Sequence, residues 1–130
     1  MKKLVLTALA LAASGCATYG PTWSEVSGQQ YYNRTTMYLR PAIIEKIDGN
    51  SAFASYPIKL EPGRHEIVLE GPTAKWPGGT PLHTITLDME PCKRYYINAQ
   101  FDNPATTPNW KPVVNYVETI AGCRTNVAAK

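Results

Sequence analysis

The chain has 130 residues, enough for one small domain, and its 13 lysines and arginines against 10 acidic residues give a net charge of +3. The basic residues are not gathered into a patch, so we expect no nucleic-acid binding, which needs clustered positive charge. Three cysteines and two distant histidines lack the ligand spacing of a zinc site. We predict neither a metal nor another cofactor.

The N-terminal segment combines a basic start with a short apolar run. Lys2 and Lys3 precede the apolar residues 4–13, and Ser14-Gly15-Cys16 follows them. A helix of ten residues covers only about 15 Å, half of a ~30 Å hydrocarbon core. The segment is therefore too short for a permanent membrane-spanning helix and is typical of an export signal, whose positive charges stay in the cytoplasm.

The end of this segment resembles the lipobox of bacterial lipoproteins. Ala13-Ser14-Gly15-Cys16 follows that pattern, except that Ala13 replaces the usual leucine. The resemblance implies cleavage between Gly15 and Cys16, a diacylglycerol on the cysteine sulfur and a third acyl chain (palmitate or similar) on its amine. Two or more such chains anchor a protein to a membrane effectively permanently. Ala17, where aspartate would signal retention, implies the outer membrane, facing the periplasm. The alternative is an ordinary secretory signal that leaves Cys16 as a plain thiol.

Export changes how the charges and the other cysteines are interpreted. Without Lys2 and Lys3, eleven basic residues remain against ten acidic ones. With Cys16 lipidated, Cys92 and Cys123 are the one remaining pair, and exported proteins keep their disulfides. Such a bridge would stabilise a small domain by about 3–4 kcal/mol. Two buried free thiols or a two-ligand metal site are the alternatives.

Residues 17–30 are rich in glycine, serine, threonine and proline, which predicts a flexible tether between the lipid and the domain. Tyr19 and Trp23 would either sit at the headgroups or fold back on the domain. We thus predict a signal peptide at 1–15, the lipidated cysteine and tether at 16–30, and one domain at 31–130.

From residue 31 onward, short apolar segments alternate with turns. Residues 37–40 and 42–47 are rich in β-branched and aromatic side chains and are separated by Pro41, which suggests an edge strand or a kink. Asp48-Gly49-Asn50 predicts a tight turn. Pro62-Gly63, after the apolar residues 58–60, predicts a type II turn.

The following strands show a period of two. His65, Ile67 and Leu69 share one face, and residues 84–90 alternate in the same way. Residues 94–101 place Tyr95, Ile97, Ala99 and Phe101 on one face, with Tyr96, Asn98 and Gln100 on the other. Residues 71–81 and 102–109 read as loops, and 112–120 as the last strand.

Pairing of the last two strands has a consequence for the cysteines. If 94–101 and 112–120 form a hairpin across the loop between them, position 92 falls opposite roughly position 120, so that Cys92 and Cys123 lie at the same end. Six or seven strands without a helix predict an all-β domain after the signal helix. The expected architecture is a small antiparallel β-sandwich, Ig-like or PEGA-like, with a small β-barrel as the alternative.

Part of the domain resembles small envelope β-domains, including PEGA-like modules. The resemblance rests on the stretch from Ile58 to Leu69 around Pro62-Gly63-Arg64-His65, on Ile47-Asp48-Gly49, and on Cys92-Lys93-Arg94-Tyr95-Tyr96-Ile97. It implies a sandwich fold and an envelope location. It carries no catalytic residues.

The sequence shows no recognisable set of catalytic residues. Nucleophilic catalysis needs a histidine base beside a nucleophile, and both His65 and His83 fit structural strand positions better. The acidic pairs Glu66/Glu70 and Asp88/Glu90 are two or four residues apart on outward strand faces. They resemble solvated surface charge more than a glycosidase pair. We therefore predict that the protein is not an enzyme, with a small hydrolase using either histidine as a remote alternative.

Aromatic side chains are the remaining candidates for a binding site. Trp76 and Trp110 lie in or beside loops, and Tyr96 and Tyr116 lie opposite their strands' apolar rows. Exposed together, they would stack on sugar rings or anchor a protein; filling a second sandwich face is the alternative. The leading hypothesis is a membrane-anchored structural or protein-interaction module of the envelope. The alternative is a glycan-binding module, or an inhibitor of an envelope enzyme, that uses the loops with Trp76 and Trp110.

Overall fold

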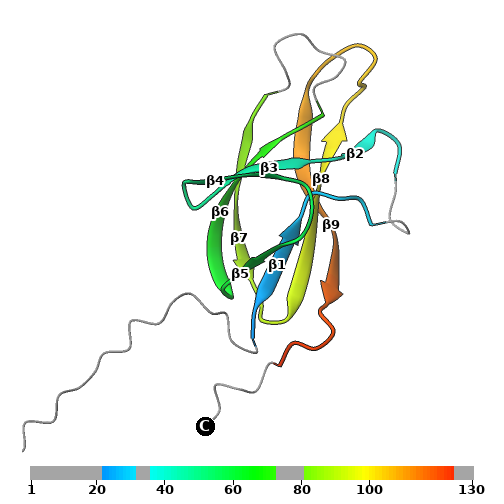
Figure 1. The fold of residues 1–130 in the computed structure, drawn as a ribbon. Helices are drawn as coiled ribbons and strands as arrows, with labels where there is room; N and C mark the ends of the chain where they lie inside the picture. The colour runs from blue at the N-terminus through cyan, green and yellow to red at the C-terminus, as the bar shows by residue number, and fades with distance from the viewer. Residues whose placement is uncertain (1–21, 32–35, 73–80, 125–130) are drawn as a thin grey trace, which may run out of the picture.

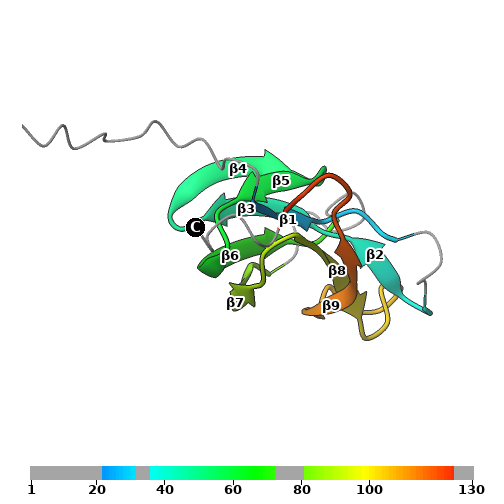
Figure 2. The same cartoon turned by 90° about the horizontal axis from the view of Figure 1, so that it is seen from below.

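The computed structural model describes residues 22–31, 36–72 and 81–124. These residues form β-strands and no helix, and the strands make two sheets that pack face to face (Figures 1 and 2). The strands are β1 (Ser24–Ser27), β2 (Leu39–Pro41), β3 (Ile43–Ile47), β4 (Asn50–Ala54), β5 (Ile58–Leu60), β6 (Gly63–Glu70), β7 (His83–Met89), β8 (Lys93–Phe101) and β9 (Trp110–Thr119). The predicted all-β sandwich is confirmed, and the sheets do not close into a barrel.

Strand β8 organises the first sheet, which we call sheet A. It pairs antiparallel with β9 along one edge, and along the other with β1 in parallel and then with β2 antiparallel. β5 completes sheet A beside β1. Sheet B has the order β4-β3-β6-β7 and is antiparallel throughout. Strands β5 and β4 therefore end their respective sheets on the same side of the sandwich, as Figure 2 shows.

The core lies between the two sheets and consists of the apolar rows that alternation predicts. From β8 it receives Tyr95, Ile97, Ala99 and Phe101, each less than a tenth exposed. The other core residues are Val26, Ala42, Ile44, Ile47, Ile67, Leu69, Met89 and Trp110. Burial of these side chains supplies the main driving force for folding.

Two predicted turns have the backbone that their residues favour. Asp48 and Gly49 both have positive φ angles, 51° and 82°, and link Ile47 to Asn50 in the β3–β4 hairpin. A two-residue hairpin loop with both φ angles positive matches the twist of its strands, and Asp-Gly is a preferred sequence for it. Gly63 is the first residue of β6 and has a φ of 124°, a backbone conformation that residues other than glycine rarely adopt.

The predicted tether is wrong for residues 24–27, which form β1 inside sheet A. Its four residues are buried, although three of them are polar. The hydroxyl of Ser24 donates to the carbonyl of Glu90 at 2.7 Å, and that of Ser27 donates to Ser55 at 3.1 Å. Polar groups are buried without penalty only when such partners exist. The domain therefore starts before residue 31.

The outer face of sheet A is partly covered, and Tyr96, expected as an exposed aromatic, is buried there. Tyr96 is 8% exposed and Asn98 is fully buried. The Asn98 amide donates to the carbonyl oxygens of Gly28 and Gln29, both at 3.0 Å. The chain that follows β1 therefore covers this face, and strand alternation does not report such a cover.

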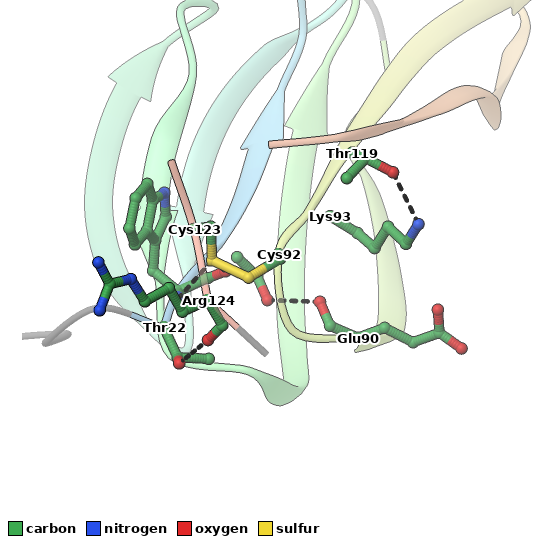
Figure 3. Close-up of a disulfide and its surroundings, with 9 residues drawn as sticks. Thr22, Glu90, Cys92, Lys93, Thr119, Cys123 and Arg124 are labelled. Atoms are coloured by element: carbon green, nitrogen blue, oxygen red, sulfur yellow. Dashed lines mark hydrogen bonds between the residues drawn. A yellow bond between two sulfur atoms is a disulfide. The ribbon is translucent and has the colours of Figure 1, made fainter. Parts of the chain in front are cut away.

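A disulfide closes the end of the sandwich at which the described chain begins. Cys92 and Cys123 are bonded, with Cα atoms 5.4 Å apart, so the predicted pairing is confirmed. Figure 3 shows the bridge between the turn before β8 and the chain after β9, next to Thr22. The hydroxyl of Thr22 donates to the carbonyl of Arg124. The bond thus joins the two strands of the β8–β9 hairpin beside the entry to β1.

The described segments contain no helix with the length and apolar character needed to cross a membrane.

Candidate functional site

The described residues form a groove on the side of the sandwich where β4 and β5 end their sheets. It has a volume of about 640 Å³, within the usual range for ligand sites. Its lining comes from one stretch of chain, residues 47–61, and from His65 on β6. The lining residues are Ile47, Asp48, Asn50, Ser51, Ala52, Tyr56, Pro57, Ile58, Lys59, Leu60, Glu61 and His65.

The groove has a partly buried apolar floor. Ile58 and Leu60 pack against the core but stay half-buried. Tyr56 also lines the groove and is 62% exposed. Uncovered apolar side chains beside an exposed aromatic ring are characteristic of protein-interaction surfaces.

His65 links the two walls of the groove. Its Nδ1 lies 2.6 Å from Oδ2 of Asp48, in the β3–β4 turn, and its Nε2 lies 2.6 Å from the carbonyl oxygen of Glu61, directly after β5. The other oxygen of Asp48 accepts the backbone N–H of Glu66 at 2.8 Å. We call these contacts among His65, Asp48 and Glu61 the histidine clasp.

Both ring nitrogens of His65 face oxygen atoms, an arrangement that suits the protonated ring, in which both nitrogens donate hydrogen bonds. Burial alone would lower the pKa of His65, but the hydrogen bonds to Asp48 and to the Glu61 carbonyl, together with the negative charges of both carboxylates, raise it above 6.5. The Glu66 N–H and then the His65 hydrogen bond lower the pKa of Asp48. The clasp therefore favours the charged form of both side chains.

These shifts give the clasp a defined pH window. A group with a raised folded-state pKa binds its proton more tightly in the folded protein, so His65 contributes its full stability below its ordinary value of 6.5. That contribution is lost as the pH rises through the raised pKa. The contribution of Asp48 is present above 3.8 and is lost as the pH falls through its lowered pKa. The clasp is at full strength between these two values.

Among the residues that the structure describes, both histidines make contacts within the fold. A general base needs a free lone pair, and both nitrogens of His65 are already engaged. The ring of His83 instead packs edge-on against that of Trp110, with centroids 4.4 Å apart. Of the carboxylates considered, Glu66, Asp88 and Glu90 are exposed and Glu70 is half-buried.

A second polar cluster lies on the outer face of sheet A, away from the core. Arg94 contacts the carboxylates of Glu25 at 2.7 Å and Glu118 at 2.9 Å, and the Tyr96 hydroxyl donates to Glu118 at 2.7 Å. Burial would lower the pKa of Arg94, but Tyr96 and Glu25 outweigh it and raise the pKa; burial raises that of Tyr96. Glu25 is only 7% exposed, and Arg94 is the partner of its buried carboxylate. The cluster joins β1, β8 and β9.

Three of the four aromatic residues predicted for binding pack within the fold, and the fourth lies outside the described residues. Trp110 is 4% exposed and donates its Nε1–H to the carbonyl of Pro81 at 2.9 Å, so the prediction of an exposed stacking ring there is wrong. Pairing with Phe101 in β8 turns it inward. Tyr96 is buried as well, and Tyr116 stacks on Tyr31 with ring centroids 4.2 Å apart. Trp76 lies outside the described residues.

The remaining predicted positions fall at the N-terminal end. Gly15, Cys16 and Tyr19 lie outside the described residues. Trp23 folds back on the domain, where the ammonium of Lys59 lies 4.3 Å from its ring centroid. Sequence reasoning did not single out the groove, Asp48 or the Glu25–Arg94 pair as a site. In the sequence, Asp48 stands out as a turn residue and His65 as a strand residue with a remote catalytic alternative, and nothing in the sequence pairs them.

Among residues 22–31, 36–72 and 81–124, no three histidine, cysteine, aspartate or glutamate side chains gather in a way that would hold a metal ion. No family model matches the chain. Neither the curated proteins nor the solved structures include a match. The lipoprotein and PEGA-like resemblances therefore stay predictions.

Proposed function

We propose that the protein is a lipoprotein of the bacterial envelope, anchored through Cys16, whose β-sandwich binds another envelope protein in the periplasm. The observation that carries the proposal is the lipobox Ala13-Ser14-Gly15-Cys16 placed just before a small exported-type domain. The disulfide of that domain supports it, because disulfides persist in oxidising compartments.

The short connection between anchor and domain supports a role close to the membrane. Five residues, 17–21, separate Cys16 from Thr22, and even a fully extended chain spans only about 3.3–3.6 Å per residue. In this proposal the disulfide end of the sandwich is held within roughly 20 Å of the lipid surface. A force on the tether would act on β1, which pairs with β5 on one side and with β8 on the other.

The chemistry of the described residues favours binding over catalysis. The charged side chains of the two clusters pair with one another within the fold: His65 with Asp48, and Arg94 with Glu25. The groove, by contrast, leaves apolar surface and the exposed Tyr56 open to solvent. Apolar and aromatic surface of this kind is what protein partners bury.

Lipid attachment is tested by the substitution Cys16→Ala and by globomycin, which blocks lipoprotein signal cleavage. We expect either treatment to leave an unprocessed precursor and the variant to lose labelling by radioactive palmitate. The matched control is Cys123→Ala, which removes a cysteine without touching the lipobox. Normal maturation of the Cys16→Ala variant would refute the anchor.

The interaction role is tested by crosslinking in intact cells. A photoreactive amino acid at Tyr56 would lie at the groove, and one at Met37, which is 75% exposed and outside the groove, serves as the control. We expect a discrete adduct with an envelope protein from position 56 and none from position 37. Absence of any adduct from position 56 would count against an interaction module.

A further inference from the structure

The groove is bordered by two strand edges that have no neighbour among the described residues. β4 ends sheet B and β5 ends sheet A, each paired on one side only. A strand edge presents backbone N–H and C=O groups that another extended chain can pair with. An extended chain is therefore the occupant whose backbone chemistry matches the groove.

The two edges are not equivalent. The β3–β4 pairing shifts register between Ile44 and Lys46, and Phe53 in β4 has a φ of 47°. Such a bulge breaks the regular spacing of hydrogen-bonding groups and discourages strand addition. The register of β5 with β1 is regular over Ile58, Lys59 and Leu60. Strand β5 is thus the edge suited to pairing.

Charge at the groove sets the polarity of the occupant. When it is protonated, the His65 ring offsets the charge of Asp48 within the clasp, and the ammonium of Lys59 lies over the ring of Trp23. The carboxylate of Glu61, which is exposed, makes no ion pair within 4 Å among the residues that the structure describes. The end of the groove at Glu61 therefore presents an exposed carboxylate that interacts with the nearby His65 ring over a longer distance but forms no direct ion pair among the described residues.

We propose that this groove binds an extended peptide segment of the partner protein, which pairs with β5, places alternate apolar side chains over Ile58 and Leu60, and presents a lysine or arginine to Glu61. The inference rests on the proposed function, since it names the kind of partner that the module takes. Apolar pockets for alternate side chains with main-chain hydrogen bonds are a recurrent mode of peptide recognition.

The flanking prolines limit the length of the pairing. Pro57 and Pro62 stand on either side of β5, and proline cannot donate a backbone hydrogen bond to an added strand. The paired stretch is therefore about three residues, as long as β5 itself. Specificity must then come largely from the floor of the groove and from Glu61.

The experiment uses the mature lipoprotein in detergent micelles and a phage-displayed library of random nine-residue peptides. We expect enrichment of peptides that alternate apolar and polar residues and contain lysine or arginine. An enriched peptide is then synthesised, and its affinity is measured by fluorescence anisotropy. Failure of the library to enrich any such peptide would overturn the proposal.

Two variants locate the binding. We expect Tyr56→Ala to weaken the peptide at least tenfold, whereas Met37→Ala, an exposed apolar truncation outside the groove, leaves the affinity unchanged. We expect Glu61→Gln to weaken it several-fold, and Asp88→Asn, at another exposed carboxylate, to leave it unchanged. Equal binding to wild type and Tyr56→Ala would place the peptide elsewhere and overturn the proposal.

A modified peptide tests strand pairing without relying on the folding of a variant. N-methylation of alternate amides removes hydrogen-bond donors and keeps every side chain. We expect the methylated peptide to bind at least tenfold more weakly in one of the two alternating patterns. Unchanged affinity in both patterns would overturn strand addition. Because binding is measured on purified protein, it separates this inference from the anchor and the cellular partner, which Cys16→Ala and crosslinking test independently.

Discussion

Replacing Gly28 with alanine would test how the chain after β1 is held against the rest of the domain. A Cβ atom at this position would lie 1.9 Å from the carbonyl oxygen of Ala42, where ordinary contacts begin at 3.4 Å. The two segments must therefore move apart by about 1.5 Å. Such a shift disrupts the hydrogen bonds that the Gly28 carbonyl accepts from the N–H of Ala42 at 2.8 Å and from the Asn98 amide at 3.0 Å.

The expected cost combines these two effects. Overpacking a close contact costs about 1–3 kcal/mol, and each hydrogen bond lost adds about 1 kcal/mol. We expect Gly28→Ala to lower the free energy of unfolding by about 3–5 kcal/mol, a large part of the ~5–15 kcal/mol typical of a domain. The midpoint of thermal unfolding should fall by more than about 10 °C.

Urea and thermal unfolding followed by circular dichroism measure the effect. Gly49→Ala is the matched control: Gly49 has a φ of 82°, but a Cβ atom added there would meet nothing within 4 Å, so only backbone strain of about 1–2 kcal/mol applies. If Gly28→Ala proves no more destabilising than Gly49→Ala, the close packing of residues 28 and 42 is refuted. Residue 28 would then belong to a tether after all.

Three further predictions concern the clasp, the bridge and the buried ion pair. His65→Asn should lower the free energy of unfolding at pH 5.5 and lower it much less at pH 8.5, because the wild-type contribution of His65 is lost as the pH rises through its raised pKa. Urea unfolding at both pH values measures the difference. An equal loss at both pH values would contradict the prediction. Replacing Cys92 and Cys123 with serine should cost about 3–4 kcal/mol, measured by urea unfolding against the oxidised wild type, and an unchanged midpoint would contradict a closed bridge. Arg94→Met should cost about 3 kcal/mol because it strands a buried carboxylate, and the added change Glu25→Gln should restore much of the loss; a double variant as unstable as the single one would show that the ion pair is not the cause.

Much of the fold follows from alternation and turn residues. The apolar row of β8 and the Asp48-Gly49 hairpin have the structure that their sequence predicts. The last strand starts at Trp110, two residues before the predicted start, because pairing with Phe101 extends it. Strand β1 escapes prediction, since Ser24-Glu25-Val26-Ser27 is mostly polar and is typical of a linker.

The candidate site is much harder to predict. Its floor and edges come from β4 and β5, which are short and end different sheets. Their adjacency depends on how the two sheets stack. The aromatic residues proposed for binding are selected by type, and two of them, Tyr96 and Trp110, are buried. Aromatic rings fill cores and binding surfaces alike, so composition alone does not separate the two roles.

The sequence by itself determined the strand pattern, the odd count of three cysteines that leaves Cys92 and Cys123 as a pair once Cys16 is set aside, and the lipobox that predicts the anchor. These properties are local, or are matters of counting. Only the tertiary structure decided that β1 is a central strand, that Arg94 accompanies Glu25 into a buried position, and that His65 clasps the groove. The type of a polar side chain indicates the free-energy cost of burying it. The partner that offsets this cost, however, comes from another strand far away in the chain, and only the tertiary structure brings the two together.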